Sequence, residues 1–189
     1  MKSLSFKVSL GGIITALSIV FMFMTGLLPL FVYVIPALCG AMLLIIAIEI
    51  SSTWSYLTYA AISVLSLLLV PDKEAALLYV FLMGFYPTLK LRLDKIKPIA
   101  LSYTVKLLIY NLLIVLYYNI TIRIISSSSL QEDMGEFGRY GIYIFWAVTN
   151  VVFLIYDIAI GRLMGLYLDW IRKKILKFSV RKGDRQDGK

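Results

Sequence analysis

The stretch GFYPTLKLR, residues 84–92, decides how the whole chain is interpreted. It directly follows the apolar run AALLYVFLM and combines a proline with two basic residues, Lys90 and Arg92. A helix that ended at Pro87 would have about a dozen residues after Ala75, whereas crossing ~30 Å of hydrocarbon takes ~20 residues. The sequence therefore predicts that the helix continues through a kink at Pro87 and leaves the bilayer beside Lys90 and Arg92.

The kink has a local consequence that the sequence also predicts. Proline lacks an N–H group, so the carbonyl of Met83 loses its partner within the helix. Gly84 lies next to that carbonyl and has no side chain, which lets a neighbouring helix or a ligand approach closely. Two interpretations are open: Pro87 bends a helix in a bundle, or it marks a functional hinge.

Composition places the chain in the membrane. Of its 189 residues, 60% are hydrophobic and 16% are charged, and the mean hydropathy is +0.87. One water-soluble core cannot hide so much apolar surface, and the charges lie between long apolar runs. The sequence predicts an all-α, polytopic protein with a six-helix transmembrane bundle in domain 1–168 and a basic tail at 169–189. The predicted spans are 8–28, 31–50, 54–70, 75–92, 99–119 and 141–165.

The basic residues predict the orientation of these spans. With a cytoplasmic N-terminus, fifteen of the 19 Lys and Arg residues fall on the cytoplasmic side, whereas Lys73, Arg123 and Arg139 fall outside. This distribution predicts a multi-pass plasma membrane protein with both termini in the cytoplasm. It also explains the excess of positive charge without nucleic acid, which is not an expected partner.

The residue inventory argues against enzyme chemistry, cofactors and metals. The chain has no histidine and a single cysteine, Cys39, which excludes histidine-dependent metal sites, catalytic triads and internal disulfides. It contains neither GxGxxG nor a Walker A loop, so any nucleotide-driven step requires a partner subunit. We therefore expect a non-enzymatic protein without a cofactor.

Two charged residues lie inside predicted spans. Lys106 is ~10 Å from the cytoplasmic start of the fifth span, and Asp157 has a similar depth in the sixth. Unpaired charges are costly in hydrocarbon, so the sequence predicts an intramembrane ion pair between Lys106 and Asp157. A structural bridge and a functional role are both open.

Uncharged polar residues predict a second cluster. Tyr143, Asn150 and Asp157 recur every seven residues, which predicts one inward-facing stripe on the sixth span. Asn111 and Asn150 both lie ~12 Å from the external boundary. A ligand pocket lined by Asn111, Tyr143, Trp146 and Asn150 would offer stacking and hydrogen bonds to a small planar molecule. The alternative is that the two asparagines simply bond one helix to the other.

The segments outside the spans are predicted from composition. The connection 121–141 contains a serine run, three glycines and three acidic residues, and is either a lid over the pocket or a solvated loop. In the tail, Ile171, Ile175 and Phe178 form one apolar stripe among basic residues, which suits a helix on an anionic membrane surface.

The layout of the chain resembles the substrate-binding S components of energy-coupling factor transporters. The likeness rests on size, six spans, cytoplasmic termini and the small residues Gly12 and Ala16 in GGIITALS, where that family has an AxxxA-like contact with its transmembrane coupling subunit. The resemblance implies a subunit that captures a small nutrient outside the cell and works with a coupling protein and two ATPases. The segment PDKEAALLYVFLMGFYPTLK is also similar to small membrane proteins of Gram-positive bacteria.

Two other function classes compete with transport. The first is a membrane scaffold, similar in size to rod-shape morphogenesis proteins, in which no ligand exists and small residues contact partner helices: Gly12, Ala16, Gly161 and Gly165. The second is a lipid-modifying enzyme, which would need paired carboxylates or a nucleophile and base at one depth. It ranks last because Glu49 and Asp157 are the sole carboxylates within the predicted spans.

Overall fold

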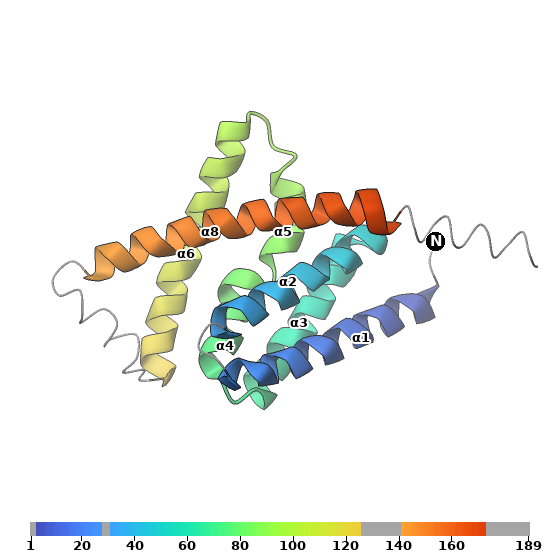
Figure 1. Cartoon of the computed structure of the whole chain (residues 1–189), viewed down its shortest axis with the longest axis horizontal. Helices are drawn as coiled ribbons and strands as arrows, with labels where there is room; N and C mark the ends of the chain where they lie inside the picture. The colour runs from blue at the N-terminus through green and yellow to red at the C-terminus, as the bar shows by residue number, and fades with distance from the viewer. Residues whose placement is uncertain (1–2, 28–30, 126–140, 173–189) are drawn as a thin grey trace, which may run out of the picture. The chain divides into compact units, whose positions relative to one another are not determined.

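The structure is a computed structural model that describes residues 3–27, 31–125 and 141–172. These ranges are helical and contain no strand (Figure 1). The elements are α1 (Leu4–Phe23), the 3-10 turn η1 (Met24–Leu27), α2 (Phe31–Glu49), α3 (Ser52–Leu69), α4 (Lys73–Leu78), the π-helix η2 (Tyr79–Met83), α5 (Tyr86–Leu93), α6 (Ile99–Ile125), α8 (Gly141–Leu166) and the π-helix η4 (Tyr167–Arg172).

Among the described residues, six helical segments are long and apolar enough to cross a membrane, which confirms the predicted all-α, multi-pass architecture. Their ends agree with the predicted spans to within a few residues. The segments are Leu4–Leu27, Phe31–Glu49, Ser52–Leu69, Lys73–Leu93, Ile99–Thr121 and Tyr143–Asp169.

The chain forms two compact units, Met1–Phe153 and Leu154–Lys189. Helix α8 begins in the first unit and ends in the second. The contacts described below lie within the first unit unless stated otherwise. The predicted boundary after residue 168 falls inside η4, and the tail from residue 173 onward, like most of the 121–141 connection, lies outside the described residues.

Short polar side chains cap the starts of three helices. The hydroxyl of Ser3 accepts from the Phe6 amide at 3.3 Å, and Ser51 does the same for α3 at 3.4 Å. The Asp72 carboxylate accepts from the Ala75 amide at 3.1 Å. These caps satisfy amides that have no intrahelical partner, and so they fix where α1, α3 and α4 begin.

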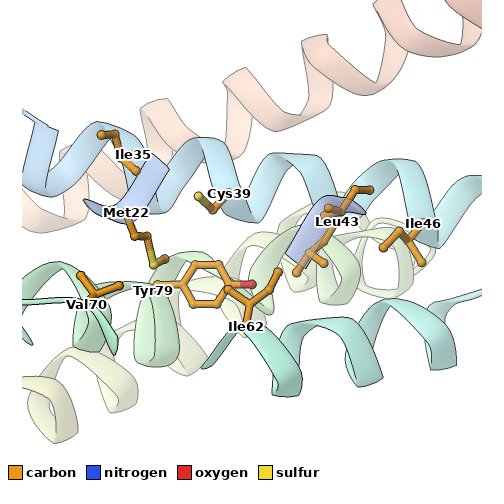
Figure 2. Packing of buried hydrophobic residues seen from close by; sticks show 9 residues of the cluster. Met22, Ile35, Cys39, Leu43, Ile46, Ile62, Val70 and Tyr79 are labelled. Carbon is orange, nitrogen blue, oxygen red and sulfur yellow. The ribbon is translucent and has the colours of Figure 1, made fainter. Parts of the chain in front are cut away.

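The fourth span is the most buried of the spans that the structure describes. In its most apolar 18-residue window 67% of the residues are buried, against at most 39% in the other five spans. Helix α2 packs against α1, α3, α4 and α5, and Figure 2 shows the buried cluster at this junction. Its members are Ile14, Met22, Ile35, Cys39, Leu43, Ile46, Ile62, Val70 and Tyr79.

The predicted kink at Pro87 takes the form of a complete break. Helix α4 ends at Leu78, the π-helix η2 follows, and the Gly84 amide donates to the Tyr79 carbonyl at 2.8 Å, five residues back. A new helix, α5, then begins at Tyr86. Pro87 therefore lies in a first helical turn, where its missing N–H costs no hydrogen bond.

The close neighbour predicted at Gly84 is a tyrosine of α3. A Cβ atom at Gly84 would lie 2.8 Å from the Tyr79 carbonyl oxygen and 2.9 Å from Cδ2 of Tyr59. The Tyr59 hydroxyl donates to the Val80 carbonyl at 2.6 Å, inside the π-helix. Tyr59 thus supplies a hydrogen bond to backbone that the break perturbs, as polar side chains do for irregular helices in membranes.

A second polar contact joins three helices near the same break. The Ser55 hydroxyl on α3 donates to the Leu43 carbonyl of α2 at 3.1 Å. Because its single proton is used there, the Thr88 hydroxyl of α5 donates to Ser55 at 2.6 Å. These two hydrogen bonds fix the positions of α2, α3 and α5 relative to one another along their axes.

Candidate ligand site between α6 and α8

The two predicted asparagines meet. Nδ2 of Asn111 on α6 donates to Oδ1 of Asn150 on α8 at 3.0 Å. In the reverse direction, Nδ2 of Asn150 donates to Oδ1 of Asn111 at 3.3 Å. The two asparagines therefore lie at the same level of α6 and α8, whereas their depth in a bilayer stays a prediction.

This amide pair is almost saturated by protein groups. Nδ2 of Asn111 also donates to the Leu107 carbonyl at 2.8 Å, and its Oδ1 accepts from the indole N–H of Trp146. Nδ2 of Asn150 donates to the Trp146 carbonyl at 2.9 Å. A carboxamide offers two donors and about two acceptor positions, so Asn111 has none left for a ligand. The pair joins α6 to α8.

An aromatic stack fixes the same two helices one turn away. The Tyr110 hydroxyl donates to the Thr149 carbonyl at 3.0 Å, and its ring stacks on Phe153 with centroids 4.2 Å apart. Phe153 also makes an edge contact with Tyr86 of α5 at 4.9 Å. These contacts hold the first half of α8 against α5 and α6 without relying on charge.

Tyr143 does not join the cluster, and its predicted inward position is wrong. Its side chain is 71% exposed, although it lies seven residues before Asn150 on the same helix. Crossing helices touch over only a few turns, and a strict seven-residue repeat drifts by ~20° per heptad on a straight helix. Two turns before the Asn111 contact, the Tyr143 side chain is therefore exposed and not packed against a neighbouring helix.

A cavity of about 230 Å³ lies beside the asparagine pair, between α6 and the first turns of α8. None of the described residues that line it is charged. Of the four predicted ligand-binding residues, only Trp146 lines the cavity, whereas Asn111, Tyr143 and Asn150 do not. The lining residues are Ile114, Val115, Tyr118, Asn119, Phe145, Trp146 and Thr149.

Sequence reasoning missed most of this lining, although a signal for it exists. Val115, Tyr118 and Asn119 follow Asn111 at helical spacings of four, seven and eight residues, and so lie on nearly the same face. Extending the asparagine face along α6 would have identified them. The prediction instead followed residue type and depth, which favoured the saturated amides.

A second hollow, of about 680 Å³ and more open, lies between α1 and α3. Gly12 and Ala16, the predicted partner-contact residues, line it and are exposed. A Cβ at Gly12 would meet nothing within 4 Å, whereas one at Gly11 would lie 3.2 Å from Oγ1 of Thr58. Gly11 therefore lets α1 approach α3, while Gly12 and Ala16 leave a surface open, and a partner there stays a prediction.

The buried Lys106 has a partner that the sequence did not indicate. Its Nζ lies 2.5 Å from Oδ1 of Asp94, and Lys90 lies 3.2 Å from Oδ2 of the same carboxylate. The Lys106 side chain is 2% exposed, and that of Asp94 is 40% exposed. Asp157 is buried and belongs to the second unit, so the predicted pair of Lys106 with Asp157 stays a prediction.

Within the described ranges no three histidine, cysteine or carboxylate side chains come together to hold a metal ion. No family model, curated protein or solved structure matches the chain, so its function is inferred from its own residues.

Proposed function

We propose that the protein is a non-enzymatic membrane subunit that binds a small, nutrient-type molecule between α6 and α8. In this proposal it is the substrate-binding subunit of an uptake transporter similar to the energy-coupling factor systems. The observation that carries the proposal is the concave, uncharged cavity of about 230 Å³. It is smaller than the ~300–1,000 Å³ of drug-sized ligand sites and larger than the ~150 Å³ that holds one benzene molecule, so it suits a small ligand.

The distribution of charge supports an uptake direction. If the termini are cytoplasmic, as fifteen of the 19 basic residues favour, the end of α6 and the start of α8 face outward. The cavity then lies in the outer half of the bilayer, where it can receive a ligand from outside. The charged residues Lys90, Asp94 and Lys106 lie toward the opposite face.

The hollow between α1 and α3 supports a partner subunit. Its floor includes Gly12 and Ala16, one turn apart, and small residues let a foreign helix approach closely within a bilayer. A transmembrane coupling subunit in contact with ATPases would supply the energy that this chain, without a Walker A loop, cannot supply itself.

Native mass spectrometry of the protein purified from its own cells tests the proposal. The test variant, Val115→Phe, fills the cavity, and the control, Val151→Phe, adds the same bulk at an exposed position of α8 outside it. We expect the wild-type protein and the control to retain a small molecule that Val115→Phe lacks. Equal retention in all three proteins, or none in any, would contradict the proposal.

A membrane scaffold is the second candidate function, and the saturated Asn111–Asn150 pair favours it. Amides that bind each other join helices and leave few donors or acceptors for a ligand.

A scaffold would use the α1–α3 hollow for a structural partner. Replacing Gly12 and Ala16 by Leu should then remove a co-purifying protein, while Ala60→Leu, at an exposed alanine of α3 outside the hollow, should not. A partner without any retained small molecule would support the scaffold over transport.

A further inference from the structure

The lining of the α6–α8 cavity restricts the chemistry of the ligand that the proposed function requires. Three of its seven lining residues are aromatic: Tyr118 on α6, and Phe145 and Trp146 on α8. The Tyr118 and Phe145 rings are 6.4 Å apart between centroids and tilted by 46°. Aromatic pairs prefer tilted or offset arrangements to a face-to-face sandwich, and such pairs gain stability beyond the burial of their area.

The polar groups of the lining are neutral and incompletely used. Nδ2 of Asn119 donates to the Val115 carbonyl at 2.8 Å, and its Oδ1 accepts no hydrogen bond from the described part of the chain. Oγ1 of Thr149 donates to the Trp146 carbonyl at 3.0 Å and keeps its lone pairs. Asn119 therefore retains one N–H donor and a carbonyl acceptor, and Thr149 retains an acceptor.

The volume limits the size of the ligand. An apolar cavity of about 150 Å³ takes up one benzene molecule. The 230 Å³ between α6 and α8 is therefore suited to one ring or two fused rings. A charged group on such a ligand would meet no counter-charge among the described lining residues and would lose its hydration without compensation.

We infer that the site takes a neutral heteroaromatic compound of one or two fused rings with a hydrogen-bonding edge, and not a carboxylate or an amine. The inference rests on the proposed function, because it specifies the ligand of the same cavity. The α1–α3 hollow provides a contrast. Its described lining residues are mainly small and aliphatic, with Lys7 as the one charged residue and Trp54 as the one aromatic residue among them, and it is wider and more open.

The inference can be tested with the full-length protein in lipid nanodiscs. The neutral probe is 5-fluoroindole, which has two fused rings and one N–H donor, and the charged probe is the matching 5-fluoroindole-3-carboxylate. Binding is followed by fluorine NMR line broadening. The test variant is Val115→Phe and the control is Val151→Phe, so that partition into lipid is the same in both.

We expect 5-fluoroindole to bind the wild-type protein and Val151→Phe but not Val115→Phe. The carboxylate should bind at least ~100-fold more weakly, because its charge is unpaired in the cavity. Asn119→Leu should weaken 5-fluoroindole by roughly 5-fold to 10-fold, the effect of one lost neutral hydrogen bond.

The contrary outcomes separate the two proposals. Suppose that the carboxylate binds the wild-type protein, that Val115→Phe abolishes this binding, and that 5-fluoroindole does not bind. The cavity is then a binding site, but the ligand class inferred here is wrong. If neither probe distinguishes Val115→Phe from Val151→Phe, and native mass spectrometry finds no retained molecule, the binding function falls together with the ligand class.

Discussion

Asp94 shows how one residue at the edge of a span can decide whether a buried charge is tolerated. Two lysine side chains, Lys90 and Lys106, converge on its carboxylate, and both are almost fully buried. The sequence identified Lys106 as a residue that needs a partner, and this expectation is confirmed by the Asp94 contact. It did not identify Asp94, because depth was compared only among residues within spans, whereas Asp94 follows α5 by one residue.

The Asp94 contact predicts a measurable loss of stability. Asp94→Asn should lower the free energy of unfolding in detergent by roughly 1–3 kcal/mol, because it leaves Lys106 with a weaker partner while solvent at the half-exposed carboxylate screens part of the effect. Asp72→Asn is the matched control and should be nearly neutral, since Asn caps a helix about as well as Asp. Equal effects of the two substitutions would show that Asp94 contributes no specific interaction.

A mutant cycle tests the predicted pair of Lys106 with Asp157. Lys106→Met and Asp157→Leu should each destabilise the protein, and the double mutant should lose less than the sum of the two single losses. Thermal or denaturant unfolding of the three variants gives the coupling energy. Additive losses would show that the two residues do not interact and would leave Asp94 as the main partner of Lys106. If the coupling energy is large and the double mutant still binds its ligand, the pair of Lys106 and Asp157 has a structural role.

At the scale of the element, the fourth span shows what a local pattern specifies and what it leaves open. Pro87 fixed the region of the break, because its ring cannot continue a helix and about a dozen residues cannot cross the bilayer. The π-helix was not predictable, since the hydrogen bond from Tyr59 to Val80 and the ring packed on Gly84 come from α3. A single segment cannot reveal which neighbour will bind its free carbonyls.

The crowding around Gly84 predicts that a side chain there destabilises the protein, unlike a side chain at the open position Gly12. Gly84→Ala should destabilise the protein by roughly 1–3 kcal/mol, because its new methyl group would lie under 3 Å from the Tyr79 carbonyl, a backbone atom that cannot move alone. Gly12→Ala is the control. It meets nothing within 4 Å and should be neutral or stabilising by up to about 1 kcal/mol. Thermal unfolding of both variants in the same detergent provides the comparison, and similar melting temperatures would contradict the packing seen around Gly84.

For the whole molecule, hydrophobicity and length were sufficient to predict six helical spans and most of their limits. Hydrophobicity and length did not predict which residues line the cavity between α6 and α8. The contact between Asn111 and Asn150 was predictable because the rise per residue is constant along a helix, so their levels on the two helices could be compared. The cavity beside them depends on which faces of α6 and α8 meet, and that depends on packing across the bundle rather than on either helix alone.

The orientation of the molecule is a separate prediction with a direct test. In a Cys39→Ala background, Pro71→Cys should react with an impermeant thiol reagent added outside intact cells, and Lys97→Cys should react only after lysis. Both positions lie in exposed connections between spans, so access and not burial decides the result. Labelling of Lys97→Cys in intact cells, with Pro71→Cys protected, would invert the topology and place the cavity in the inner half of the bilayer.

The broken fourth span also sets conditions on biogenesis. Lys73–Leu93 is one of the two least hydrophobic spans, and part of its backbone depends on a hydroxyl of α3 for a hydrogen-bond partner. Alone in lipid, it would expose carbonyls that hydrocarbon cannot solvate. Because the chain is synthesised from the N-terminus, α1, α2 and α3 are made before the fourth span. The hydroxyl groups of α3 are therefore already present when the fourth span enters the membrane. We therefore expect a ribosome-bound chain that stops after residue 93 to hold this span in the membrane only when α3 carries an intact Tyr59.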